Sequence, residues 1–200
     1  MITRHLVLFV RAPVLGVGKR RLAGEAGDIA ALRFERAMLG LLAHRLGRDR
    51  RWRLRLAVTP DHGVARRRLW PRAASVRPQG AGDIGVRMRR ALSACPPGPA
   101  VLVGADIPRL EPRHIAEAFR LLGRHDIVFG PAADGGFWLV AARRSPRLPP
   151  LFGAVRWSGP HALADVLGNL PRWVSVGFAA GLEDVDGAEA LRRLAPRRGF

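Results

Sequence analysis

The sequence has little cysteine, lysine or acid, and it has no long apolar run. Its single cysteine, Cys95, cannot form an internal disulfide or a zinc site built on several cysteines. Apolar runs such as Leu6–Val10 are far shorter than the roughly 20 residues that a membrane-spanning helix needs. The N-terminus also lacks the length and the small-residue cleavage site of a secretory signal. We therefore expect a cytoplasmic protein with no membrane span, in which Cys95 has a structural role.

The shortage of acidic residues leaves a large positive charge. The chain has 34 basic and 16 acidic residues and a formal net charge of +18, which favours anionic partners such as nucleotides, nucleic acids or acidic membranes. The arginines are spread over every segment and form no stripe with interleaved aromatic side chains, so a nucleic acid is not the favoured partner. Because Lys19 is the only lysine, we interpret the arginine excess mainly as a bias of the genome's composition. The ammonium group retained at Lys19 is then informative.

The order of the apolar segments predicts a single α/β domain over residues 1–200. Short β-like runs alternate with segments of helical period, which predicts a three-layer sandwich with a mostly parallel central sheet. Such sheets bind ligands at the carboxyl ends of their strands. The expected strands are Leu6–Val10, Leu54–Val58, Ala74–Val76, Val101–Val103, Ile127–Phe129, Phe137–Ala141 and Val174–Val176. The expected helices are Ile29–Leu46, His62–Trp70, Ile84–Ala94, Pro112–Leu122, Pro160–Leu170 and Ala188–Leu194.

The loop after the first expected strand, residues 11–22, combines two glycines with several cations. Glycine lets backbone N–H groups approach a phosphate, and the cations neutralise the phosphate charge. The loop is not a Walker A motif, because Pro13 stands where the first glycine is required and Arg20 where the hydroxyl residue is required. The loop therefore suits the phosphates of a nucleotide, and a solvated basic turn is the alternative.

Two further segments follow expected strands. In residues 79–88, Asp83 is a good helix N-cap, and the amide of Gln79 beside exposed backbone groups could read the edge of a nucleobase. Asp106 follows the strand Val101–Val103 and is expected to project into the crevice. A carboxylate that faces a diphosphate needs a divalent cation between the two groups. Asp106 is therefore a candidate metal ligand, and a turn-forming aspartate is the alternative.

Two acidic segments lie later in the chain. Asp134 is followed by two glycines, which makes this segment a candidate for chemistry at the crevice and equally a candidate hairpin turn. Asp184 and Asp186 stand before the last expected helix and supply two carboxylates at alternating spacing. Asp186 could instead cap that helix.

The order of these five segments resembles a family of small bacterial transferases with the nucleotide-diphospho-sugar transferase (GT-A) fold, described as radical-SAM/selenodomain-associated transferases or arsenosugar-biosynthesis glycosyltransferases. More distantly, it resembles 2-phospho-L-lactate guanylyltransferase and molybdenum-cofactor guanylyltransferase. The similarity covers nearly the whole chain, about residues 5–195. The matching positions are Arg11, Pro13, Gly16, Lys19, Arg21, Leu22, Gln79, Gly82, Asp83, Gly85, Arg87, Met88, Gly104, Asp106, Pro108, Gly130, Pro131, Asp134, Gly135, Gly136, Trp157, Ser158, Asp184 and Asp186.

The resemblance implies a Rossmann-like GT-A domain that binds an activated nucleotide together with Mg²⁺ or Mn²⁺. Asp106 would hold the metal against the phosphates, and either Asp186 or Asp184 would complete the metal site. Lys19 and Arg21 would stabilise the leaving group, and Asp134 would position or deprotonate the acceptor. The implied nucleotide-binding residues are Arg11, Pro13, Gly16, Lys19, Arg21, Gln79, Gly82, Asp83 and Gly104.

The sequence departs from the family pattern at Arg20 and Gly159, where the family has threonine, and at Ala190, where it has an acid. Our leading hypothesis is transfer of a sugar from a nucleotide-sugar to a small-molecule acceptor. The first alternative is nucleotidyl transfer from a nucleoside triphosphate with release of pyrophosphate. A protein that binds nucleotides without turnover and a nucleic-acid-binding protein are further alternatives.

Overall fold

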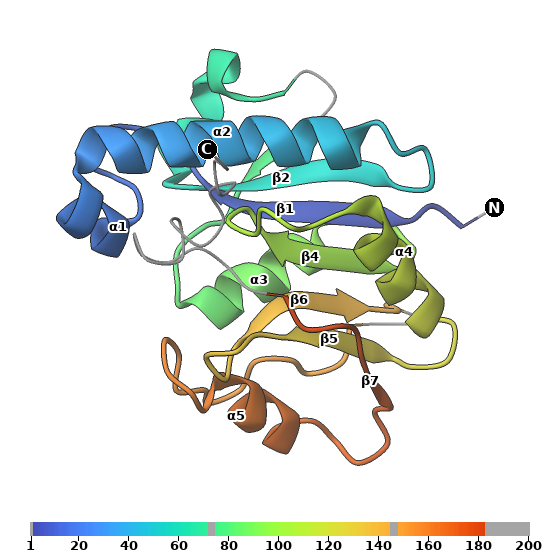
Figure 1. Ribbon diagram of the computed structural model, residues 1–200. Helices are drawn as coiled ribbons and strands as arrows, with labels where there is room; N and C mark the ends of the chain where they lie inside the picture. Colours follow the sequence, from blue (N-terminus) through green and yellow to red (C-terminus); the bar gives the residue numbers. More distant parts are fainter. Residues whose placement is uncertain (1, 72–74, 145–147, 183–200) are drawn as a thin grey trace, which may run out of the picture.

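Seven strands form a central mixed sheet in the computed structural model, which describes residues 2–71, 75–144 and 148–182 (Figure 1). The strands are β1 (His5–Arg11), β2 (Arg53–Thr59), β3 (Ser75–Pro78), β4 (Ala100–Gly104), β5 (Ile127–Pro131), β6 (Phe137–Ala142) and β7 (Val176–Phe178). Their order across the sheet is β3-β2-β1-β4-β6-β5-β7. Neighbouring strands are parallel except at β6, which runs antiparallel to both β4 and β5.

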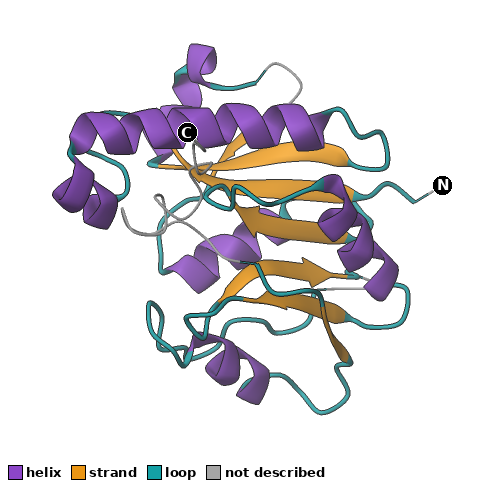
Figure 2. Cartoon of the chain, in the orientation of Figure 1, coloured by secondary structure: helices purple, strands orange, loops and turns teal. Residues whose placement is uncertain are grey.

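Helices cover both faces of this sheet, as Figure 2 shows. They are α1 (Arg20–Ala26), α2 (Asp28–Gly47), α3 (Ile84–Ser93), α4 (Pro112–Leu121) and α5 (Ala162–Gly168). Buried side chains of α2 and α4 share one apolar cluster, whereas those of α3 and α5 share the other. The expected three-layer α/β sandwich is therefore confirmed.

Strand β1 shows why the apolar runs are continuous. Leu6 and Leu8 are fully buried in the cluster that contains α2, and Val7 is buried in the cluster that contains α3. Successive side chains of a strand point to opposite faces of a sheet, so a strand covered by helices on both faces needs an apolar residue at every position.

The strand order reverses between β1 and β4, which creates a topological switch point at the carboxyl edge of the sheet. Helix α2 joins β1 to β2 on one face, and α3 joins β3 to β4 on the opposite face. The order reverses at these two neighbours because the chain continues from β1 to β2 on one side and from β4 to β5 on the other. A crevice forms at such a point in open α/β sheets.

Some expectations differ from the structure. Residues 61–69 form two short 3₁₀ turns, Asp61–Ala65 and Arg67–Leu69, so the helix expected over His62–Trp70 is wrong. The buried Trp70 indole donates from Nε1 to the Gly63 oxygen at 3.0 Å, which folds this segment back on itself.

Two more elements need correction. Helix α1 was not expected, and the last described strand lies at Val176–Phe178 instead of Val174–Val176. The expected helix Ala188–Leu194 and the first residue of the expected strand Ala74–Val76 lie outside the described residues. Within the described part of the chain, none of the helices is both long enough and apolar enough to cross a bilayer.

Candidate active site

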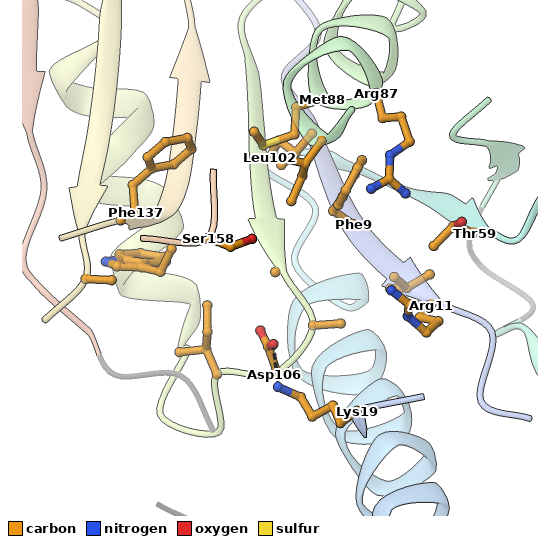
Figure 3. Close-up of a pocket in the computed structure, with 18 of the residues that line it drawn as sticks. Phe9, Arg11, Lys19, Thr59, Arg87, Met88, Leu102, Asp106, Phe137 and Ser158 are labelled. Atoms are coloured by element: carbon orange, nitrogen blue, oxygen red, sulfur yellow. Dashed lines mark hydrogen bonds and ion pairs between the residues drawn. The ribbon is translucent and has the colours of Figure 1, made fainter. Parts of the chain in front are cut away.

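A cleft of about 520 Å³ opens at the carboxyl edge of the sheet, where β1 and β4 diverge (Figure 3). Its walls come from the ends of β1, β2, β4 and β6, from α2 and α3, and from the segment 157–162. Apolar side chains form much of the lining, and charged groups stand at a few positions. The cleft thus lies where the topology predicts a ligand site.

An ion pair between Lys19 and Asp106 lies in the cleft. Lys19 Nζ donates to Asp106 Oδ2 at 2.8 Å, and the two side chains are 14% and 31% exposed. Lys19 immediately precedes α1, which is anchored because Leu22 is fully buried between α1 and α2. Asp106 follows the end of β4. The structure therefore brings together two residues that the sequence separates by 87 positions.

Glu35 lies next to this pair and is not among the site residues expected from the sequence. The backbone N–H of Lys19 donates to Glu35 Oε1 at 3.1 Å, and Glu35 Oε2 is buried without a hydrogen-bond partner. Burial raises the pKa of the Glu35 carboxyl, and the Lys19 N–H opposes that rise. A Cβ atom at Gly18 would clash with the Glu35 carboxylate, so only glycine fits there without a shift. A signal existed, because Glu35 stands on the helical stripe between the buried Ala31 and Leu39.

The loop between β1 and α1 contributes part of what was expected. Arg11, Lys19 and Arg20 line the cleft. The expected Arg21 does not, because its side chain is exposed on α1. Arg11 also donates from Nη1 to the Val17 oxygen at 3.2 Å, which ties the two ends of the loop. Two other candidates, Pro13 and Gly16, likewise lie outside the lining, Gly16 at a turn with φ of 75°.

The segment before α3 uses its polar groups mainly within the protein. Asp83 Oδ1 accepts from the Val86 N–H at 2.8 Å, so the helix N-cap interpretation is confirmed. Gly82 and Asp83 do not line the cleft, whereas Gln79 does. The Gln79 amide is 1% exposed and gives both of its hydrogens to backbone oxygens, so these donors are not presented to a nucleobase.

The β5–β6 turn forms the opposite wall. Asp134 Oδ1 accepts from the Gly136 N–H at 2.9 Å, and β5 and β6 pair antiparallel, so the hairpin interpretation is confirmed. Asp134 also lines the cleft, as do Gly136 and Phe137. The segment around Asp134 is therefore both a hairpin turn and part of the cleft lining.

The sequence matches, over residues 42–159, the family described as "Uncharacterized protein conserved in bacteria (DUF2064)". The chain belongs to this family. No curated protein matches the sequence. The family description names no reaction, so the proposed chemistry is argued from the residues of the cleft.

Solved structures share the fold of this DUF2064 protein. A proposed nucleotide-diphospho-sugar transferase from Desulfovibrio desulfuricans G20 has 25% identity and a TM-score of 0.86, over 100% of this chain and 90% of that chain. The 4-diphosphocytidyl-2C-methyl-D-erythritol synthase of Anaerococcus prevotii DSM 20548 has 9% identity and a TM-score of 0.61, over 96% of each chain.

A third similar structure contains ligands. Glucosyl-3-phosphoglycerate synthase from Mycobacterium tuberculosis, in complex with Mn²⁺, uridine diphosphate and glucosyl-3-phosphoglycerate, has 13% identity and a TM-score of 0.54, over 92% of this chain and 71% of that chain. The three structures confirm the expected nucleotide-diphospho-sugar transferase fold of this DUF2064 chain.

The described residues suit a divalent cation that is shared with a substrate phosphate. Asp106 offers a carboxylate in the cleft, and Glu35 Oε2 is a buried oxygen without a hydrogen-bond partner. No three His, Cys, Asp or Glu side chains converge within residues 2–71, 75–144 and 148–182. Mg²⁺ is commonly held by one or two carboxylates plus substrate phosphates, so Asp106 fits on those terms. The candidates Asp184 and Asp186, and the departure at Ala190, lie outside the described residues.

Three remaining candidates are placed by the structure. Gly104 lines the cleft at the end of β4, and Gly159 lines it beside Ser158. Cys95 is buried away from the cleft, and burial raises the pKa of its thiol. A buried thiol of raised pKa is a poor nucleophile.

Proposed function

We propose that this DUF2064 protein is a transferase that uses an activated nucleotide and moves a sugar from a nucleotide-sugar to a small-molecule acceptor. The observation that carries this proposal is the Lys19–Asp106 ion pair in the cleft at the β1/β4 switch point. The pair places an ammonium group and a carboxylate where the loop rich in glycine and cations meets the end of β4. That combination suits a phosphate and its counter-ion.

Asp106 is our candidate ligand for Mg²⁺ or Mn²⁺, and Asp186 is the candidate for a second ligand. When bound, the cation would neutralise negative charge on the phosphates. The similar glucosyl-3-phosphoglycerate synthase, which holds Mn²⁺ and uridine diphosphate, supports this assignment. Glu35 lies close enough to Asp106 for its negative charge to affect the Glu35 pKa, so a cation beside Asp106 would also relieve that repulsion.

The cations of the loop would stabilise the departing nucleoside diphosphate. In glycosyl transfer, the bond between the sugar carbon and the phosphate oxygen breaks and the acceptor oxygen bonds to the sugar. The developing charge on the diphosphate would be met by Lys19 and by Arg20, which lines the cleft where Arg21 does not. Asp134 is the candidate to take the proton from the acceptor hydroxyl, because it lies on the opposite wall.

Nucleotidyl transfer is the second candidate. The structural similarity to 4-diphosphocytidyl-2C-methyl-D-erythritol synthase favours it. The acceptor oxygen would then attack the α-phosphate, and pyrophosphate would leave. The same fold serves different bond cleavages, so the fold does not select between the two reactions.

A thermal-shift screen tests the proposal. The intact protein is titrated with UDP-, GDP- and ADP-sugars, GTP and CTP, with and without Mg²⁺ or Mn²⁺. A ligand that binds only the folded state stabilises it by RT ln(1 + [L]/Kd), about 2.7 kcal/mol at a hundredfold excess over Kd. We expect one nucleotide class to shift the melting temperature in the presence of metal.

Two variants complete the screen. Asp106→Ala should remove the metal-dependent shift, and Glu117→Ala, which removes an acid of α4 outside the cleft, should retain it. Product analysis with the nucleotide that binds then identifies the broken bond, since a nucleoside diphosphate indicates glycosyl transfer and pyrophosphate indicates nucleotidyl transfer. The proposal fails if no nucleotide shifts the protein while a duplex or single-stranded nucleic acid does.

A further inference from the structure

Arg87 is held in the cleft by neutral groups. Its Nη1 donates to Gln79 Oε1 at 3.1 Å, and its Nε donates to the Asp83 backbone oxygen at 3.4 Å. The guanidinium carbon lies 6.0 Å from the centre of the Phe9 ring. Among the described residues, no carboxylate forms an ion pair with Arg87. The guanidinium is thus fixed in place without neutralisation of its charge.

Gln79 fixes the direction of this contact. Its Nε2 donates to the Val10 oxygen at 3.1 Å and to the Ala57 oxygen at 2.9 Å, so both amide hydrogens are used at the ends of β1 and β2. The amide oxygen is therefore the atom left to face Arg87. This chain of hydrogen bonds connects the guanidinium to the backbone of the sheet, which orients it before any ligand arrives.

The remaining donors of Arg87 are available to a ligand. A guanidinium group has five N–H bonds. One at Nε and one at Nη1 are used, which leaves three without an acceptor among the described residues. Arg87 lines the cleft and is half-buried, so these donors are partly withdrawn from water.

Apolar side chains lie beside Arg87 on one side. Figure 3 shows Arg87 beside Phe9 and Met88, and the Lys19–Asp106 pair at the other end of the view. Met88 belongs to the buried cluster on the α3 side of the sheet, and Phe9 packs against that cluster. A partly buried cation that is bonded only to neutral oxygens gains free energy when an anion meets it.

We propose that Arg87, oriented by Gln79, forms a second oxyanion-binding position in the cleft and takes a carboxylate or phosphate group of a bound ligand. The planar guanidinium matches both groups through paired hydrogen bonds. This inference rests on the proposed function and deepens it. It implies that the ligands of this transferase carry an oxyanion on the α3 side, in addition to the phosphate beside Lys19. The oxyanion comes either from the phosphate chain of the nucleotide or from an acidic acceptor.

Calorimetric titration of the intact protein tests this position. The variants are Arg87→Gln, which removes the charge, and Arg87→Lys, which keeps the charge and loses the planar fork. Arg89→Gln is the matched control, because Arg89 is exposed on the same helix and does not line the cleft. The first probes are glycerol 3-phosphate and lactate, with glycerol as the neutral reference. Melting temperatures check that each variant is folded.

We expect Arg87→Gln to weaken binding of an oxyanion probe by about tenfold or more, the usual worth of a charge-assisted hydrogen bond. Arg87→Lys should recover part of the affinity, and Arg89→Gln should bind like the unaltered protein. A nucleoside and its mono-, di- and triphosphates then identify the source. If the loss in Arg87→Gln appears only when phosphates are added, the oxyanion belongs to the nucleotide. If nucleotide affinity is unchanged and only the acidic probes lose affinity on the nucleotide-saturated protein, it belongs to the acceptor.

Two results would overturn the inference. One is unchanged affinity for every oxyanion probe and nucleotide in Arg87→Gln. The other is an equal loss for the nucleoside without phosphate, because Arg87 would then contact the base. Failure of the proposed function gives a different pattern, in which no nucleotide binds the unaltered protein while the oxyanion probes still bind and still depend on Arg87.

Discussion

The sheet has a carboxyl edge and an amino edge, formed by the two ends of its parallel strands, and both edges bury ionisable groups. Of these described groups, only those at the carboxyl edge face the cleft. The carboxyl edge holds Lys19, Glu35 and Asp106 around an open cleft. The amino edge holds His5, which is 1% exposed, and Cys95, which is 5% exposed. Burial, assisted by Arg55, lowers the pKa of His5, and burial raises the pKa of Cys95. Judged by buried titratable groups alone, both edges would be candidate sites.

The arginines at the two edges differ in how many of their donors the protein itself accepts. At the amino edge, Arg144 donates to the oxygens of Ser93, Pro96 and Gly98, and thereby holds the turn after α3. At the carboxyl edge, Arg87 keeps donors that no described residue accepts. His5 Nε2 at the amino edge and Glu35 Oε2 at the carboxyl edge are both buried without a hydrogen-bond partner among the described residues. The comparison therefore shows that a perturbed pKa or an unpaired buried atom marks burial, whereas a functional site also needs a cavity and charged groups that face it.

The largest effect expected from this comparison is on activity. Lys19→Ala should lower turnover by about a hundredfold or more, because it removes the cation expected to meet the leaving phosphate. Arg144→Ala should leave nucleotide affinity unchanged and lower the free energy of unfolding instead. Steady-state kinetics and urea unfolding of the two variants measure this. A large loss of nucleotide affinity in Arg144→Ala would show that the two edges are not separate in function.

A second prediction concerns Gly18. A Cβ atom there would clash with the Glu35 carboxylate, so Gly18→Ala should push that carboxylate away from the Lys19 backbone N–H, from which it accepts a hydrogen bond. We expect nucleotide affinity to fall by about tenfold. The double variant Gly18→Ala/Glu35→Ala should recover part of that loss, since the clashing group is gone. Calorimetric titration of the single and double variants measures the coupling, and strictly additive losses would argue against the contact.

At the amino edge, Cys95→Ser should cost stability without affecting the cleft. Cys95 Sγ donates to the Ala91 oxygen at 3.5 Å, which is longer than a good hydroxyl hydrogen bond, so the serine hydroxyl would be poorly paired in a buried site. Burying a poorly paired hydroxyl costs about 1–3 kcal/mol. Denaturant unfolding gives the stability, and the thermal shift caused by the best nucleotide gives the binding. A serine variant of normal stability that no longer binds nucleotide would contradict the structural role of Cys95.

The smallest expected effect is a pH dependence at Glu35. Burial raises the Glu35 pKa above its ordinary 4.5, so the folded protein holds that proton more tightly than the unfolded chain does. Stability from this group is therefore greatest at low pH and falls as the pH rises from the ordinary value through the raised one. Glutamine does not titrate, so Glu35→Gln does not lose stability from this group as the pH rises, and its amide oxygen can still accept from the Lys19 N–H. The variant should melt higher than the unaltered protein near neutral pH, by a margin that shrinks on acidification. A margin that grows on acidification would mean that the pKa is lowered.

The sequence predicts the central sheet well because its signal is local. Each strand buried on both faces needs a short continuous apolar run, and such runs mark β1, β4, β5 and β6 directly. In β2 the run is interrupted by Arg55, which is only partly buried. Helix α1 carries a weaker signal, since Leu22 is its only buried residue. The segment 62–70 has a helical pattern but folds as 3₁₀ turns, because Trp70 reaches back to the Gly63 oxygen and tertiary contacts override the local preference.

The site is only partly visible in the sequence. Lys19 and Asp106 were found because each follows a strand, and the structure shows that their side chains meet. Glu35 was missed because a lone acid on a helix reads as solvated, and its role comes from a backbone contact with the loop before α1. The sequence suggests that the Gln79 amide could read a nucleobase, whereas the structure shows its hydrogens donated to backbone oxygens of β1 and β2.

The antiparallel strand β6 has a consequence for how this protein can vary. Its hairpin brings residues 132–138 to the cleft as one continuous stretch, whereas the Lys19, Asp106 and Arg87 wall comes from residues earlier than 108. The cleft is therefore divided between two consecutive portions of the chain. Insertions or exchanges in the hairpin can thus reshape one wall while the other keeps its sequence, and chimaeras joined near Ile127 would exchange that wall as one unit.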